Sequence, residues 1–272
     1  MYLISLHPAN AIDKIARIGL ADRHDVIARM SESDDTDTKV DITEGGVKAI
    51  DYFSLSHPLR KMASIVSLNA RMSMFEFFME TMKPTPLTSV VDVGITPDTT
   101  LPDSNFFERL YPDRNRLVTT SIEDASFITE IYPGIQFVRT PKNSLPFCDN
   151  AFDIIFCSAV LEHVGEESAQ RNFIKEILRI SKRFFIITPN RLFPVEFHTF
   201  LPLIHWLPQT CHQAILKKIS MDFWSETSNL NLLTPSKLKR LFPKNSTLNI
   251  KYNFLMGIPS NIIAYGQSTK KS

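Results

Sequence analysis

Three side chains in this sequence are suited to proton transfer: His163, Glu196 and His198. The unperturbed pKa of histidine is ~6.5, so its ring accepts or releases a proton close to neutral pH. Glu162 directly precedes His163, and Glu196 lies two residues before His198. We take His163, Glu196 and His198 as candidate general bases. The alternative for His163 is that it braces the loop before the next helix.

Asn190 and Arg191 suggest a second kind of chemistry, the binding of a substrate. Amide and guanidinium groups hold anionic or hydroxylated ligands by paired hydrogen bonds. Both residues belong to the polar and aromatic stretch 188–199, which also contains Glu196 and His198. The alternative is that this stretch only ties an insertion to the rest of the domain.

Two apolar runs predict strands that end at a ligand site. In SVVDVG, residues 89–94, Gly94 lacks the Cβ that would block close approach of a ligand. The run 152–159 leads into SAVLEHV, residues 158–164. In α/β proteins ligands bind beyond the carboxyl ends of parallel strands. We therefore expect the two strand ends to meet at one site.

These motifs together resemble the class I S-adenosylmethionine-dependent methyltransferases, in the branch that methylates small molecules. The resemblance covers about residues 60–265. It rests on a first strand that ends in Asp-x-Gly (Asp92 to Gly94), and on a later LPF-x-DN-x-FD motif followed by a second strand and by LEHV, residues 161–164. It implies that S-adenosylmethionine is the cofactor and that its methyl group passes to a small-molecule or saccharide acceptor by direct displacement. The glycine loop is divergent, because ITPDTT follows Gly94 where the family has further glycines.

The resemblance also implies which residues bind the cofactor. In the family, an acid after the second strand holds the ribose; Ser121 has that position and Glu123 follows two residues later. Leu145 lies in the segment that runs along the adenine, and Ser158 approaches the sulfonium. Helix capping is the alternative role for Glu123, and loop bracing for Asp92. The full candidate set is Asp92, Gly94, Thr96, Ser121, Glu123, Leu145 and Ser158.

The elements that must position these residues alternate along the chain, which predicts an α/β fold with a doubly wound, mostly parallel, Rossmann-like sheet. A long apolar helix precedes the sheet, and two strand-like runs near the C-terminus predict an antiparallel pair at its edge. The predicted helices are 59–82, 103–110, 123–131 and 166–182, and the predicted strands are 89–94, 116–122, 135–139, 152–158 and 184–188.

Composition divides the chain into two parts. Residues 1–50 form an N-terminal extension with an acidic loop, SESDDTDTKVDITEGG, that we expect to be flexible. Residues 51–272 form the methyltransferase-like domain. Within it, about residues 189–244 are an insertion rich in proline and aromatic residues, which we expect to form a helical cap.

Charge, apolar runs and cysteine content limit the ligands and the cellular location that fit this sequence. The 30 basic and 29 acidic residues leave a net charge of +1, which argues against nucleic acid as a ligand. No apolar run reaches the ~20 residues of a membrane span, although peripheral contact stays open. Three cysteines without a C-x-x-C pair support neither disulfides nor structural zinc, and we assign no metal ligand. A reducing, cytoplasmic location fits.

A second function is compatible with the same fold. The divergent glycine loop and the missing ribose acid would both be expected of a methyltransferase-like domain that has lost turnover and serves as a binding or assembly partner. The polar residues of 158–164 and 188–199 favour the enzyme, because a scaffold does not require them.

Overall fold

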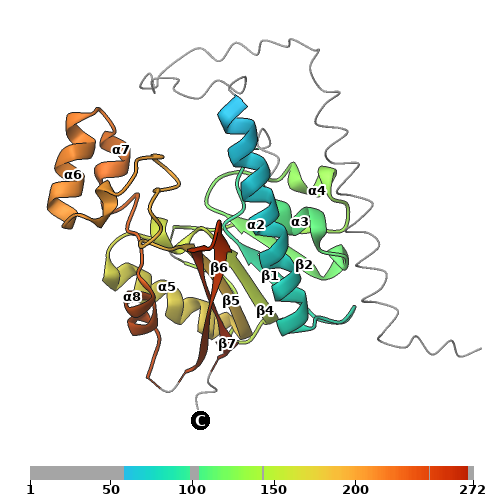
Figure 1. Ribbon diagram of the computed structural model, residues 1–272. Coiled ribbons are helices and arrows are strands. Elements are labelled where there is room, and N and C mark those ends of the chain that lie inside the picture. The colour runs from blue at the N-terminus through green and yellow to red at the C-terminus, as the bar shows by residue number, and fades with distance from the viewer. Residues whose placement is uncertain (1–57, 99–103, 143, 245, 269–272) are drawn as a thin grey trace, which may run out of the picture. The chain divides into compact units, whose positions relative to one another are not determined.

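A single seven-stranded sheet organises the computed structural model, which describes residues 58–98, 104–142, 144–244 and 246–268 (Figure 1). The strand order is β3-β2-β1-β4-β5-β7-β6. The predicted N-terminal extension, residues 1–50, lies outside the described residues. The strands are β1 (Val90–Val93), β2 (Leu117–Ser121), β3 (Gln136–Arg139), β4 (Phe152–Ser158), β5 (Ser181–Pro189), β6 (Thr247–Leu255) and β7 (Ile258–Gln267).

Strands β1 to β5 run parallel to one another, and β7 pairs antiparallel with both β5 and β6. The predicted doubly wound sheet with an antiparallel C-terminal pair is therefore confirmed. From β1 the chain proceeds outward through β2 and β3, then returns to place β4 on the other side of β1. This reversal makes a topological switch point between β1 and β4, where α/β sheets bind ligands.

Helices cover both faces of the sheet. The α-helices are α2 (Pro58–Met82), α3 (Phe106–Leu110), α4 (Ile128–Ile131), α5 (Glu167–Ile180), α6 (Gln209–Lys218), α7 (Asp222–Ser225) and α8 (Pro235–Leu241). Short 3-10 turns are η1 (Arg114–Arg116), η2 (Leu161–His163) and η3 (Ile204–Trp206). Figure 1 shows α2 and α3 on one side of the sheet and α5 and α8 on the other.

The central strand β4 is buried on both faces, as its continuous apolar sequence requires. Its side chains alternate: Ile154 and Phe156 join the core under α2 and α3, while Ile155 and Cys157 join the core under α5 and α8. Phe156 stacks on Phe107 of α3 with ring centroids 4.0 Å apart. These two cores hold the strand ends in fixed positions.

Three predicted helix boundaries are corrected. The predicted helix 103–110 begins only at Phe106, because Asn105 has a left-handed backbone conformation, with φ of 49°. The predicted helix 123–131 is shortened to α4, because the Asp124 carboxylate accepts the Ser126 N–H and forms a turn instead of a first helical turn. The predicted helix 166–182 ends at Ile180, where Ser181 turns extended and its hydroxyl donates to the Ile177 carbonyl. Strand β5 therefore begins at Ser181, three residues before its predicted start.

The insertion between β5 and β6 holds η3, α6, α7 and α8. Helix α8 packs Leu238 and Leu241 into the core beside α5. In Figure 1 α6 and α7 lie apart from the sheet. The apolar segment after β5 is not buried: Phe200, Leu203, Trp206 and Leu207 are 40% to 50% exposed.

Asp153 braces the opposite, amino-terminal edge of the sheet. Its carboxylate accepts the backbone N–H and the hydroxyl of Ser89 before β1, at 3.0 and 2.9 Å, and the Lys182 ammonium at 2.7 Å. The hydrogen bond from Lys182, followed by those from Ser89, lowers the pKa of Asp153 to about 2. One carboxylate thus links the starts of three strands.

Replacing this carboxylate is expected to destabilise the fold. Because the pKa of Asp153 is lower in the folded state, its contribution is present above the unfolded-state pKa of ~4 and is lost as the pH falls towards 2. Asp153→Ala should lower the free energy of unfolding by about 1–2 kcal/mol at pH 7 and by much less near pH 2, measured by urea unfolding. The exposed Asp149, paired with Arg179, is the control; Asp149→Ala should change stability by under ~0.5 kcal/mol. An equal effect of Asp153→Ala at both pH values would contradict this role.

Candidate functional site

A cavity of about 250 Å³ opens at the carboxyl ends of β1, β2 and β4, on both sides of the switch point. Its walls are mainly apolar. The lining residues that follow β1 and β2 are Gly94, Ile95, Thr96, Pro97, Ile122 and Glu123. Those on the facing wall are Thr140, Pro141, Leu145, Ala159, Val160 and His163. The cavity therefore brings together Gly94, Thr96, Ser121, Glu123 and Leu145 of the predicted cofactor set.

Gly94 makes the turn from β1 into this cavity. Its φ is +94°, and a Cβ at this position would lie 2.2 Å from Cγ2 of Val160. A side chain is therefore excluded both by backbone strain and by the facing wall. Although the loop lacks the further glycines, its N–H groups stay close to the sheet: those of Gly94 and Ile95 donate to the Thr120 carbonyl.

The end of β2 presents one buried hydroxyl and one exposed carboxylate. Ser121 is buried, and its Oγ accepts the backbone N–H of Glu123 at 3.2 Å. That hydrogen bond fixes the turn that carries Glu123 along the cavity rim. The Glu123 side chain is exposed, so its carboxylate remains available to a ligand.

Asp92 does not line the cavity. It is buried beneath the Gly94 turn, with the fully buried Glu108 of α3 as its charged neighbour. Burial, and then the charge of Glu108, raises the pKa of Asp92 well above its usual value. Burial likewise raises the pKa of Glu108. Burial therefore favours the protonated form of both carboxyl groups, and the predicted contact of Asp92 with the cofactor would require access that the cavity does not give.

Ser158, predicted near the sulfonium, ends β4 and does not line the cavity. Ala159 and Val160 line it instead. Ala159 has φ of +56°, and its N–H donates to the Ile187 carbonyl of β5. This left-handed residue turns the chain out of β4 and into η2, which carries Glu162 and His163.

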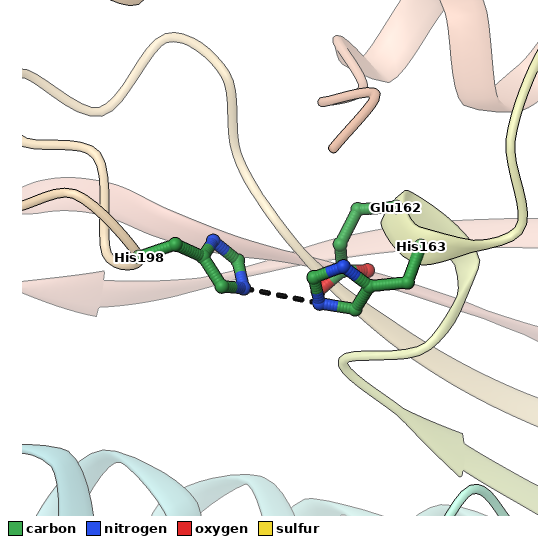
Figure 2. A group of neighbouring side chains, drawn as sticks. All are labelled: Glu162, His163 and His198. Carbon is green, nitrogen blue, oxygen red and sulfur yellow. Dashed lines mark hydrogen bonds and ion pairs between the residues drawn. The ribbon is translucent and has the colours of Figure 1, made fainter. Parts of the chain in front are cut away.

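Glu162, His163 and His198 converge beside the cavity (Figure 2). Nε2 of His163 lies 3.1 Å from Nε2 of His198, and Nδ1 of His163 lies 2.6 Å from the Asn229 carbonyl oxygen. Glu162 is fully buried; its Oε2 accepts the Thr188 hydroxyl at 3.0 Å. Its Oε1 lies 4.0 Å from Nε2 of His163 and has no hydrogen-bond partner among the described residues.

Glu196 orients His198. One carboxylate oxygen accepts hydrogen bonds from Nδ1 and from the backbone N–H of His198, at 2.6 and 2.8 Å. The other oxygen accepts a hydrogen bond from the Thr199 N–H. Burial alone would raise the pKa of Glu196, but these hydrogen bonds outweigh it and lower the pKa to about 2. Burial would lower the pKa of His198, and Glu196 reverses the shift and raises it. All three predicted general bases therefore belong to one cluster.

Asn190 and Arg191, the predicted substrate residues, brace the insertion in this structure. The Asn190 amide donates to the Pro259 carbonyl at 2.8 Å and its oxygen accepts the Leu192 N–H. The Arg191 guanidinium donates to the carbonyls of His205 and Leu207, each at 3.0 Å. Neither residue lines the cavity at the strand ends. The arrangement corresponds to the alternative that we kept for this stretch.

Sequence reasoning missed three contributors to the cluster. Thr188 is the penultimate residue of β5 and donates to Glu162, the Asn229 carbonyl accepts from His163, and the centroid of the Trp224 ring lies 5.0 Å from that of His198. Asn229 and Trp224 come from the insertion, about sixty residues beyond His163. A backbone carbonyl leaves no trace in the sequence, so Asn229 had no signal. Thr188 was visible as the polar residue that ends a predicted strand.

Known proteins resemble this chain in sequence over one segment and in fold over most of the described residues. Residues 114–184 match the family model described as "Methyltransferase domain". The fold matches the crystal structure of a putative S-adenosylmethionine-dependent methyltransferase from Listeria monocytogenes with a TM-score of 0.51. The match covers 75% of this chain and 99% of that chain, at 10% sequence identity. Over residues 114–184 this chain is therefore similar to methyltransferase domains, and it shares the fold of that structure. The PH0226 protein from Pyrococcus horikoshii shares the fold with 13% identity, 80% and 95% coverage and a TM-score of 0.50.

Two curated sequences are more similar to this chain in sequence than these structures are, but over a shorter stretch of it. An uncharacterized protein found in two strains of Mycobacterium tuberculosis is 28% identical over 117 residues, 40% of this chain. The match spans 38% of the length of that relative. This chain therefore spans well under two thirds of the length of that relative.

Because Asp92 and Glu108 are buried together, we expect the free energy of unfolding to fall as the pH rises. Because the folded-state pKa of Asp92 is raised, the folded methyltransferase domain holds a proton that the unfolded chain releases above pH ~4. Glu108→Gln removes the neighbouring charge and should raise the free energy of unfolding by about 1–2 kcal/mol at pH 8, and by less at pH 5, in urea unfolding. The exposed Glu130→Gln is the control and should be neutral at both pH values. A gain that does not depend on pH would show that the pair shares no proton.

Proposed function

We propose that this chain transfers the methyl group of S-adenosylmethionine to a small-molecule or saccharide acceptor. The observation behind the proposal is that His163 lies on the wall of the cavity at the switch point and belongs to an acid–base cluster whose two carboxyl groups, Glu162 and Glu196, are buried. The fold supplies the place for the cofactor, and the cluster supplies chemistry that a scaffold does not need.

The residues of the cavity fit the cofactor. Gly94 leaves the space that a Cβ would fill, so a ligand can approach the backbone after β1. Glu123 offers an exposed carboxylate that can accept two hydroxyl hydrogen bonds of a ribose. Leu145 and Val160 give apolar surface for an adenine ring. Ser121 would act indirectly, since it holds the turn of Glu123.

The reaction requires alignment and, for a hydroxyl acceptor, removal of one proton. When bound, S-adenosylmethionine supplies a methyl group on a positively charged sulfur. The acceptor's lone pair forms the new bond to the methyl carbon, while the carbon–sulfur bond breaks and its electrons stay on sulfur. The acceptor's proton would pass to Nε2 of His163, and the neighbouring His198 and Glu196 would stabilise the added charge.

Helix composition, free cysteines and net charge support the partners and the location that we propose. None of the helices in the described part of the chain combines the length and apolar character that a membrane span requires. Cys148, Cys157 and Cys211 are free thiols, which supports a reducing, cytoplasmic location. The near-zero net charge supports a small acceptor over nucleic acid. We keep residues 189–244 as the segment that carries acceptor-side groups, since it supplies Glu196, His198 and Trp224.

Isothermal titration with S-adenosylhomocysteine, the product form of the cofactor, tests the proposal. The wild type should bind with a micromolar Kd, and Glu123→Ala should weaken binding about tenfold, about 1.4 kcal/mol, through loss of the ribose contact. Glu130→Ala removes an exposed acid outside the cavity and should bind as the wild type does. No binding by folded wild-type protein would favour the alternative, a domain without turnover that serves as a binding partner.

The Gly94 turn gives a second, stronger test. Gly94→Ala places a methyl group against Val160 at the cavity wall and should abolish detectable binding of S-adenosylhomocysteine. Gly257→Ala is matched for backbone strain, because Gly257 also has positive φ, but a Cβ there meets open space. The control should lose stability alone, about 1 kcal/mol, and keep its affinity. Equal affinity of Gly94→Ala and Gly257→Ala would place the ligand elsewhere.

A further inference from the structure

The two histidines of the cluster present facing lone pairs. A carbonyl oxygen only accepts hydrogen bonds, so the 2.6 Å contact with Asn229 puts a proton on Nδ1 of His163. The contact of Nδ1 of His198 with the Glu196 carboxylate does the same for that ring. In the neutral rings, both Nε2 atoms are therefore unprotonated acceptors, yet they lie 3.1 Å apart. A cation between them would turn this repulsion into attraction.

The third donor distinguishes a metal ion from a shared proton. Glu162 is fully buried, and its Oε1 lacks a hydrogen-bond partner among the described residues. Oε1 lies 4.0 Å from Nε2 of His163, and one ligand atom from each of the three side chains lies within 4.8 Å of the other two (Figure 2). A proton between the rings would leave this buried oxygen unsatisfied. A metal ion would satisfy all three atoms.

The spacing of the rings fits metal coordination. With metal–nitrogen bonds of ~2.0–2.1 Å, two imidazoles on neighbouring coordination positions bring their nitrogens roughly 2.9–3.4 Å apart. The observed separation is 3.1 Å. Each ring also has the outer partner typical of metal-bound histidine, which is a carboxylate for His198 and a backbone carbonyl for His163.

We propose that Glu162, His163 and His198 bind a divalent transition-metal ion. Two imidazoles and one carboxylate suit Zn²⁺, Fe²⁺ or Mn²⁺, while Mg²⁺ and Ca²⁺ prefer sites made of oxygen alone. Three protein ligands leave open positions for a further ligand. The His163 side chain is 33% exposed and that of His198 is 17% exposed, so an ion can reach the site from solvent.

An ion here would also join two parts of the fold. Glu162 and His163 belong to η2 after β4, whereas His198 belongs to the insertion after β5. Ligation would fix the insertion against the end of the sheet. Nε2 of His163 would then be a metal ligand, so its role as proton acceptor applies to the metal-free protein. Because His163 lines the cavity, the open positions of the ion would attract acceptors that carry oxygen donors, and the ion would favour release of the hydroxyl proton to solvent. This last role rests on the proposed function, whereas the ion site does not.

Titration of tag-free, metal-stripped protein with Co²⁺ tests the site, because Co²⁺ replaces the proposed ions and its visible spectrum reports coordination by nitrogen. We expect one Co²⁺ per chain, displaced by Zn²⁺ and not by Mg²⁺, and a spectrum that changes when acetohydroxamate occupies the open positions. His163→Ala and His198→Ala should each weaken binding at least 100-fold. Glu196→Gln should weaken it by about 10–100-fold, since Glu196 holds a ligand without touching the ion.

His212→Ala is the matched control, because His212 lies on α6 outside the cluster. It should bind Co²⁺ as the wild type does. Circular dichroism of each variant separates loss of ligand from loss of fold, and Glu162→Gln provides a third ligand variant that retains the side-chain shape. Absence of stoichiometric Co²⁺ binding by the wild type, or binding by both histidine variants with the affinity of the wild type, would overturn the proposal. Neither result depends on S-adenosylhomocysteine, whose titration is read separately.

Discussion

The pairing of β1 with β4 is the constraint on which the site depends. The chain completes β1, β2 and β3 before it returns to place β4 on the open edge of β1, with Val93 beside Cys157. This register puts the Gly94 turn opposite Val160, so two segments more than sixty residues apart form the walls of one cavity. Both faces of these strands are buried, which leaves their carboxyl ends as the accessible edge.

The insertion completes what the strands begin. Strand β4 delivers Glu162 and His163, but neither has a complete set of partners within the sheet. The loop after β5 adds His198, already oriented by the buried Glu196, and the segment before α8 adds the Asn229 carbonyl. Polar atoms of this kind are costly to bury unless each finds a partner. The cluster therefore has the character of a binding site more than of a packed core.

Much of the fold could be predicted from the sequence. The continuous apolar run of β4 and the alternation of strands with helices indicated a buried parallel sheet, and the C-terminal pair followed from its two strand-like runs. Errors arose where local hydrogen bonds override periodicity, as at Asp124 and Ser181. The site was predicted less completely. The spacing of Glu196 and His198 marked them as candidates, but their contact with His163 depends on how the insertion folds back, which no local pattern encodes.

Hydrogen exchange of the full chain with and without S-adenosylhomocysteine would map where the ligand binds without assuming an acceptor. We expect slower exchange at the amides of residues 94–97, 121–123 and 159–164, on both sides of the switch point, and unchanged exchange in β6 and β7. Slower exchange confined to other segments, or none at a ligand concentration far above micromolar, would contradict the claim that this cavity holds the cofactor.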